Sequence, residues 1–113
     1  MRVVSQDGMS DVPYENSCLD IVCLEPKRTA IYFKNIHFDV SIRLAGYSTK
    51  EKAIKAMEML REQYSRIRII KALASGTCEH MEKSLKPEEF KDILEEYINM
   101  EVFQFPQDDE IEV

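Results

Sequence analysis

Four basic side chains lie close together in the middle of the chain: Arg61, Arg66, Arg68 and Lys71. On a helix they would fall within about three turns. An arginine guanidinium can donate two parallel hydrogen bonds to phosphate oxygens, so this cluster is suited to a phosphorylated ligand. The same cations could instead stabilise the C-terminal end of a helix or pair with the acidic last helix, and the sequence leaves these alternatives open.

A second basic point, Lys27 and Arg28, follows Pro26 in a connection between two expected strands. Aromatic side chains could stack on a nucleobase, although aromatic residues at helical or strand spacing more often belong to a core. The aromatic candidates are Tyr32, Phe33, Phe90, Tyr97 and Phe103. For a small phosphorylated ligand we expect a site formed by Arg28, Arg61, Arg66, Arg68, Phe90 and Tyr97.

Residues that could perform catalysis are few. His37 and His80 are the two histidines, and Cys78 with His80 would supply only two ligands of a zinc site. The three glycines form no phosphate-binding loop with a GK[ST] motif. The carboxylates of residues 88–96 lie mostly on the expected polar face of a helix, and nothing in the sequence supports a cysteine–histidine nucleophile pair. We therefore expect a binding protein rather than an enzyme, with no catalytic residue, no metal and no cofactor.

The composition predicts one soluble globular domain over residues 1–113. The chain is 44% hydrophobic and 32% charged, which suits one modest core. No apolar segment approaches the roughly 18 residues of a membrane helix, and the N-terminus lacks the layout of a signal peptide. The three cysteines contain no CxxC pair, which indicates free thiols in a reducing compartment. We expect a cytoplasmic protein that does not bind membranes.

The net charge of −6 is distributed unevenly along the chain. Residues 43–71 carry eight basic and three acidic side chains, whereas residues 72–113 carry three basic and twelve acidic ones. Such a basic segment can bind an anionic ligand, pair with the acidic part of the same chain or pair across a subunit interface. The sequence pI of about 5.0 disfavours binding to double-stranded DNA.

Residues 1–46 predict an antiparallel β-meander. Asp7-Gly8 favours a type I′ hairpin turn between strands at 1–5 and 12–14. Further strands are expected at 18–24, 29–33 and 36–44. In the last of these, apolar and polar residues alternate over nine positions, which predicts one buried face. The residues of that face are Ile36, Phe38, Val40, Ile42 and Leu44.

A long helix over residues 47–74 is predicted to cover this sheet. Ser48 and Glu51 have the spacing of an N-terminal capping box. Apolar residues then recur at helical spacing, and Ser75-Gly76 is expected to end the helix. This apolar stripe contains Ala53, Ile54, Ala56, Met57, Leu60, Tyr64 and Ile67.

The rest of the chain predicts a second helical element, a strand and an acidic tail. A short helix from Thr77 and an amphipathic helix starting at Pro87 are expected within residues 77–100. The apolar face of the second helix would contain Phe90, Ile93, Leu94, Tyr97 and Ile98. A strand at 101–106 returns to the sheet, and residues 107–113 form the tail. The fold class is therefore α+β, an antiparallel meander covered by a long helix and a second amphipathic helix, with a short C-terminal strand.

Two stretches of the sequence resemble small proteins of prophages and mobile elements in Gram-positive gut bacteria. They are MRVVSQDGMSDVPYE at the N-terminus, and YSTKEKAIKAMEMLREQY together with FQFPQDDE later in the chain. The size and the succession of sheet and helices also resemble the first-described Thoeris anti-defence family. Members of that family bind cyclic ADP-ribose signals without cleaving them and assemble as oligomers. No ligand motif of that family aligns here, so the resemblance assigns no site residue.

The resemblance implies a phage-type immune-evasion protein in the cytoplasm of an infected or lysogenic bacterial host. Such a protein would bind and sequester a cyclic nucleotide immune signal, either a cyclic ADP-ribose isomer or a cyclic oligonucleotide. A pocket between protomers of a homo-oligomer would provide volume that one short chain lacks. The alternatives are an acidic inhibitor of a host defence nuclease, similar to anti-CRISPR proteins, and an accessory phage protein without a ligand.

Overall fold

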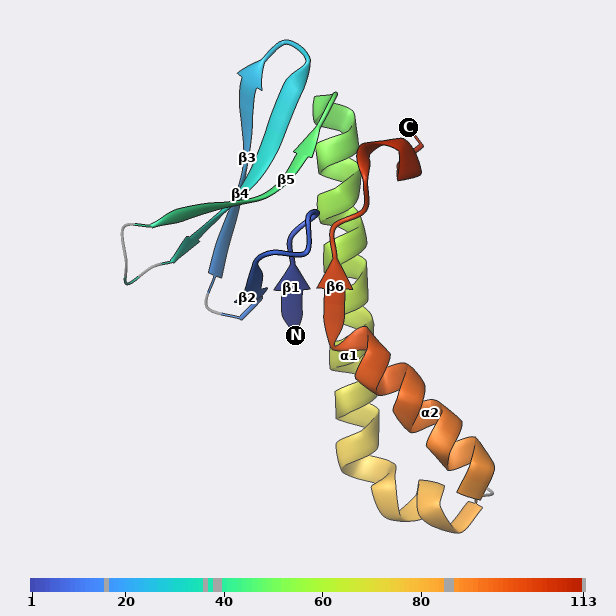
Figure 1. Ribbon diagram of the computed structural model, residues 1–113. Coiled ribbons are helices and arrows are strands. Elements are labelled where there is room, and N and C mark those ends of the chain that lie inside the picture. Colours follow the sequence, from blue (N-terminus) through green and yellow to red (C-terminus); the bar gives the residue numbers. More distant parts are fainter. Residues whose placement is uncertain (16, 36, 38–39, 85–86, 113) are drawn as a thin grey trace.

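The computed structural model describes residues 1–15, 17–35, 37, 40–84 and 87–112, with the side chains of 73–84, 87, 90, 93 and 94 outside that description. The described chain has the predicted α+β architecture, with two three-stranded sheets and two helices. Figure 1 shows both sheets beside the long helix α1 (Lys50–Ser84), while α2 (Pro87–Met100) runs back along the second half of α1. Neither described helix is both long and apolar enough to cross a membrane.

The first sheet joins the two ends of the chain. Strand β1 (Arg2–Val4) pairs antiparallel with β2 (Asp11–Pro13), as the hairpin prediction requires. On its other side, β1 pairs in parallel with β6 (Val102–Gln104), so the order is β2-β1-β6. The C-terminal strand is confirmed, but a division into two sheets was not predicted, because hydrophobic patterning does not specify which strands pair.

The turn between β1 and β2 is wider than the expected type I′ turn. The Gly8 N–H donates to the Ser5 carbonyl at 2.9 Å, so Gln6 and Asp7 are the central residues of the turn. Gly8 follows them with a φ of 76°, a conformation that glycine adopts without steric cost. Hydrogen bonds from the Ser5 hydroxyl and the Met9 N–H hold the pKa of Asp7 below its usual value. Asp7 therefore stabilises the turn through its carboxylate, and Gly8 adopts the positive φ that follows the two central residues.

The second sheet is antiparallel and has the order β3-β4-β5. Its strands are β3 (Ser17–Glu25), β4 (Arg28–Asn35) and β5 (Ser41–Tyr47). The prediction for the last strand is wrong at both ends, since β5 starts at Ser41 and continues past Ala45-Gly46. Val40 is 55% exposed rather than buried, while Ile36 and Phe38 lie outside the described residues.

A β-bulge explains why the alternation misplaced the end of β5. Ile31 pairs with Ala45 and Tyr32 pairs with Arg43, so Leu44 has no partner on β4. Leu44 and Ala45 are consequently both buried, which breaks the alternation of the two faces. The bulge also determines where Arg43 lies.

The long helix starts and ends differently from the prediction. Thr49 is its N-cap, because the Thr49 hydroxyl accepts a hydrogen bond from the Lys52 N–H at 3.2 Å. The expected capping box of Ser48 and Glu51 is therefore wrong. The helix also continues through Ser75-Gly76 to Ser84, since one interior glycine costs only about 1 kcal/mol and does not have to end a helix. The prediction that α2 starts at Pro87 is confirmed.

The core lies where α1 packs against both sheets. From the sheets come Val3, Phe103, Ile31, Phe33 and Leu44, from the segment after β6 comes Phe105, and from α1 come Ala53, Ala56, Leu60 and Ile67. The predicted stripe of α1 is confirmed except for Ile54, which is exposed. On α2, which packs mainly against α1 and β6, Ile98 is 62% exposed rather than part of a buried apolar face.

Candidate functional site: a basic groove beside Gly46

The structure does not bring the six predicted ligand residues together. Arg28 is the first residue of β4, whereas Arg61, Arg66 and Arg68 lie along α1 and are exposed. The side chain of Phe90 lies outside the described residues. The predicted cluster is therefore divided among at least three places.

Tyr97 has a structural contact that the sequence did not reveal. Its side chain hydrogen-bonds Glu101, and the Lys71 Nζ lies 3.4 Å from the Glu101 Oε1. These contacts with Tyr97 and Lys71 hold the pKa of Glu101 below its usual value. Lys71, one of the four clustered cations, thus pairs with an acidic residue of the same chain, which was one of the open alternatives.

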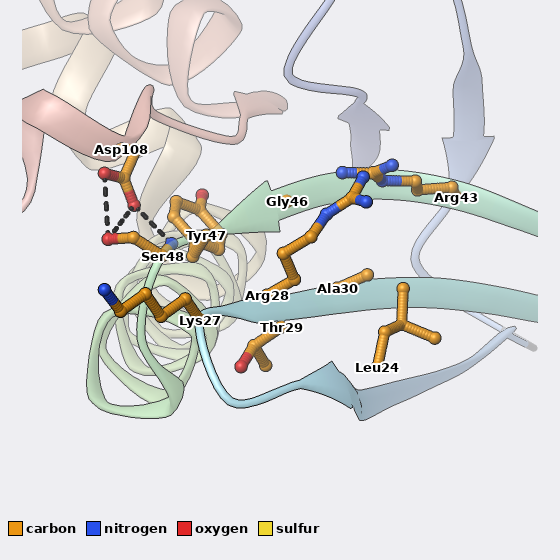
Figure 2. Close-up of a pocket in the computed structure, with 10 residues that line it drawn as sticks. All are labelled: Leu24, Lys27, Arg28, Thr29, Ala30, Arg43, Gly46, Tyr47, Ser48 and Asp108. Atoms are coloured by element: carbon orange, nitrogen blue, oxygen red, sulfur yellow. Dashed lines mark hydrogen bonds between the residues drawn. The ribbon is translucent and has the colours of Figure 1, made fainter.

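Arg28 lines a small groove together with Arg43, a residue that the sequence reasoning did not select. The groove has a volume of about 230 Å³ and is open to solvent at the outer side of the β4–β5 pair. Its lining residues are Leu24, Lys27, Arg28, Thr29, Ala30, Arg43, Gly46, Tyr47, Ser48 and Asp108. Figure 2 shows the side chains of Arg28 and Arg43 extending toward each other beside Gly46. We call this hollow the basic groove.

The β3–β4 hairpin positions the first two cations. Pro26 and Lys27 form a two-residue connection, and Glu25 pairs with Arg28 at the start of the ladder. Lys27 therefore projects from the turn, while the backbone of Arg28 is held within the sheet. The fixed φ of Pro26 restricts the turn and so fixes the direction in which both side chains leave it.

The bulge and a glycine position the third cation. Because Leu44 is the extra residue, Arg43 and Gly46 lie on the same face of the sheet, opposite Tyr32 and Ala30. A Cβ at position 46 would overlap the guanidinium of Arg43. The missing side chain of Gly46 thus provides the space in which the Arg43 guanidinium lies against the backbone.

The guanidiniums in the basic groove are available to a ligand. In the described part of the chain, no carboxylate forms an ion pair with Lys27, Arg28 or Arg43. The carboxylate of Asp108, the acidic residue in the lining, is already bound by Ser48 and Lys52. Two arginines with five donors each can together hold a phosphate or pyrophosphate group.

Asp108 binds the start of α1. Its carboxylate accepts hydrogen bonds from the Ser48 N–H at 2.7 Å and from the Ser48 hydroxyl at 3.0 Å, and it pairs with the Lys52 Nζ at 3.2 Å. The contacts of Ser48, followed by that of Lys52, hold the pKa of Asp108 below its usual value. The predicted acidic tail is thus attached to the start of α1 through Asp108, which begins a short 3₁₀ helix, η1 (Asp108–Glu110).

Tyr47 forms a rigid wall of the groove. Its hydroxyl donates to the Pro106 carbonyl at 2.8 Å. Burial, followed by the charges of Asp108 and Glu110, raises the pKa of Tyr47 far above its usual value. The hydroxyl therefore stays protonated at neutral pH and acts as a hydrogen-bond donor.

The groove continues into a neighbouring hollow of about 330 Å³ on the other side of Arg43. This hollow is lined by Gln6, Asp7, Arg43, Leu44, Ala45 and Gly46. The Asp7 carboxylate there is engaged by the turn, as described above. Arg43 therefore stands between two hollows and can reach an anion in either.

A sequence signal for Arg43 exists but is weak. The alternation of residues 36–44 placed Arg43 on the solvent face, and a glycine three residues later indicates space beside it. Nothing in the sequence marks the bulge that turns Arg43 toward Arg28. No three His, Cys, Asp or Glu side chains of the described residues are grouped to hold a metal ion.

Comparisons with known proteins found no match for this chain among protein-family models, curated proteins or solved structures.

Proposed function

We propose that this protein binds a phosphorylated small molecule in the basic groove and sequesters it without changing it chemically. The observation that supports this proposal is the placement of Arg28 and Arg43 on one open groove with no carboxylate of the described residues paired to either. Two arginines that lie close together without an acidic partner favour an anionic ligand, because each positive charge raises the energy of the other.

We infer that the ligand is a cyclic nucleotide immune signal, either a cyclic ADP-ribose isomer or a cyclic oligonucleotide. The resemblance to phage immune-evasion proteins makes these molecules the first candidates. A groove of about 230 Å³ is smaller than the roughly 300–1,000 Å³ of typical small-molecule pockets. The groove of one chain would thus hold the phosphates, and a second protomer of a homo-oligomer would cover the rest of the ligand.

Native mass spectrometry of the protein purified from cells that express the immune synthase tests this proposal. We expect a homo-oligomer that carries a small molecule whose mass equals that of the unmodified signal. The Arg28→Gln/Arg43→Gln variant should have the same oligomeric state without the bound mass. Recovery of only the unliganded protein, or of a hydrolysed product, would contradict sequestration.

A second candidate function has one supporting observation on α2. Five carboxylates of this helix, all exposed, give it a strongly acidic surface: Glu88, Glu89, Asp92, Glu95 and Glu96. Such a surface could occupy the nucleic-acid site of a basic defence nuclease. Inhibition of a purified nuclease that is lost in the Glu95→Gln/Glu96→Gln variant and kept in Arg28→Gln would favour this function over sequestration.

A further inference from the structure

A third hollow lies between α1 and the residues Tyr14, Glu15 and Ser17. Its volume is about 420 Å³, within the range of small-molecule sites. Tyr14 and Tyr64 form its walls, and the partly buried side chains of Leu19 and Met57 form its apolar floor. We call this hollow the tyrosine cleft.

The two tyrosines make a fixed aromatic surface. Their ring centroids are 4.6 Å apart, and the rings are tilted by 57°. The Ser17 hydroxyl donates to the Tyr14 carbonyl at 2.6 Å and so links Tyr14 to the start of β3, while Tyr64 belongs to the regular part of α1. An aromatic surface held on both sides can stack a planar ring without a large loss of side-chain entropy.

Cations stand beside this surface on the same face of α1. Arg61, Tyr64 and Arg68 have the spacing i, i+3 and i+7, so they form one row along the helix. The Arg61 side chain lines the cleft, and the Arg68 Cζ lies 6.0 Å from the centre of the Tyr64 ring. Arg66, two residues before Arg68, points to a different side of the helix.

The positive charge of Arg61 is not compensated within the cleft. The hydrogen bond that the structure gives its guanidinium runs from Nε to the Met57 carbonyl of the same helix, at 3.4 Å. Glu15, which also lines the cleft, accepts two hydrogen bonds from the Met1 amine, at 2.8 and 3.1 Å. This amine holds the pKa of Glu15 below its usual value, so the carboxylate is ionised but already paired.

We infer that the tyrosine cleft is a second ligand site, which takes a planar aromatic ring carrying a phosphate group, as in a purine nucleoside monophosphate. The ring would contact Tyr14, Tyr64 and the apolar floor. The phosphate would accept hydrogen bonds from Arg61, with Arg68 adding positive charge at the end of the row.

The tyrosine cleft is separate from the basic groove. Ser17, which lines the cleft, is the first residue of β3. Glu25, which pairs with Arg28 of the groove, is the last residue of the same strand. The lining residues of the cleft and those of the groove do not overlap. The inference can therefore be tested independently of the proposed function.

Nuclear magnetic resonance titration of the full chain with AMP tests this inference, with adenosine and ribose 5-phosphate as separate arms. We expect saturable shifts of the Tyr14 and Tyr64 ring signals with AMP, weaker binding of adenosine, and no ring shifts with ribose 5-phosphate. Arg61→Gln should weaken AMP binding about tenfold, because a charge-assisted hydrogen bond is lost.

Three controls make the titration decisive. Arg66→Gln removes an equal charge from another side of α1 and should leave AMP binding unchanged. Tyr64→Leu should abolish it, and an unchanged melting temperature would show that the variant is folded. Arg28→Gln/Arg43→Gln should bind AMP in the cleft like the wild type. The inference is overturned if AMP causes no saturable shift at Tyr14 and Tyr64, or if Arg61→Gln and Arg66→Gln weaken binding equally.

Discussion

The side chain of Gln6 holds the backbone of Gly46, and this contact joins the two sheets at the basic groove. The Gly46 N–H donates to the Gln6 Oε1 at 2.9 Å, and the Gln6 N–H donates to the Leu44 carbonyl at 2.7 Å. The Gln6 Nε2 reaches the Pro106 carbonyl at 3.0 Å. One residue of the first turn thus contacts both sides of the bulge and the segment that follows β6.

Replacement of Gln6 by Ala should lower the free energy of unfolding by roughly 1–3 kcal/mol, because the Gly46 N–H loses its partner and the Pro106 carbonyl loses one of its two donors. It should also weaken ligand binding at the basic groove, since the side-chain bond that holds Gly46 beside Arg43 is lost. Gln104→Ala is a matched control, because its side chain makes one longer bond, to the Ser5 carbonyl at 3.3 Å. Equal destabilisation by the two variants, measured by urea unfolding, would contradict this role of Gln6.

Gly46→Ala and Gly8→Ala should have opposite effects. At position 46 the new methyl group meets the flexible end of Arg43, so the guanidinium would move, binding would weaken and stability would change little. At position 8 the φ of 76° strains any other residue, so stability should fall by about 1 kcal/mol while binding is kept. Calorimetric binding and thermal unfolding of both variants measure the two effects. A Gly46→Ala protein with wild-type binding would show that Arg43 does not need this space.

Asp108→Asn should lower the melting temperature at neutral pH. The pKa of Asp108 is depressed in the folded protein, so its charged contacts stabilise the fold above the usual value of 3.8 and are lost as the pH falls below it. The difference between wild type and variant should therefore shrink as the pH is lowered through that region. Asp109→Asn, at an exposed neighbour, is the control. A difference that does not depend on pH would rule out this linkage.

Ile67→Ala and Ile69→Ala test the packing of α1 against the sheets. Ile67 is buried in the core, whereas Ile69 is 60% exposed two residues later. The first change should cost roughly 2–5 kcal/mol of stability and the second much less. Chemical denaturation of both variants compares them directly, and similar losses would mean that the buried face of α1 is assigned incorrectly.

The local elements of this fold and its antiparallel hairpin pairing could be predicted from the sequence, but the division into two sheets and the parallel pairing could not. Turn residues and apolar spacing located the first hairpin, the strand at Val102–Gln104 and the start of α2. The parallel pairing of β6 with β1 depends on contacts between residues about a hundred positions apart, which no local pattern encodes. Gly76 predicts a helix end because glycine is common at that position, but the α1 backbone remains helical through it.

Only part of the candidate site could be predicted, because its side chains also meet through contacts between distant residues. Arg28 was selected because it follows a turn, and the structure places it at the groove. Arg43 was assigned to a solvent face, and only the bulge at Leu44 turns it toward Arg28. Tyr97 was selected for its aromatic ring, but the fold places its hydroxyl against Glu101. Side chains that meet through tertiary contacts need the fold before they can be recognised as one site.

Isothermal titration of wild type and of the Arg28→Gln/Arg43→Gln variant with cyclic ADP-ribose isomers and cyclic oligonucleotides tests the binding proposal most directly. We expect one of these ligands to bind the wild type, to be recovered intact, and to bind the variant at least about tenfold more weakly, since charge-assisted hydrogen bonds are lost. Arg66→Gln should bind like the wild type. Flat titrations with every ligand, or equal binding by wild type and double variant, would contradict the proposal that the basic groove sequesters a phosphorylated signal.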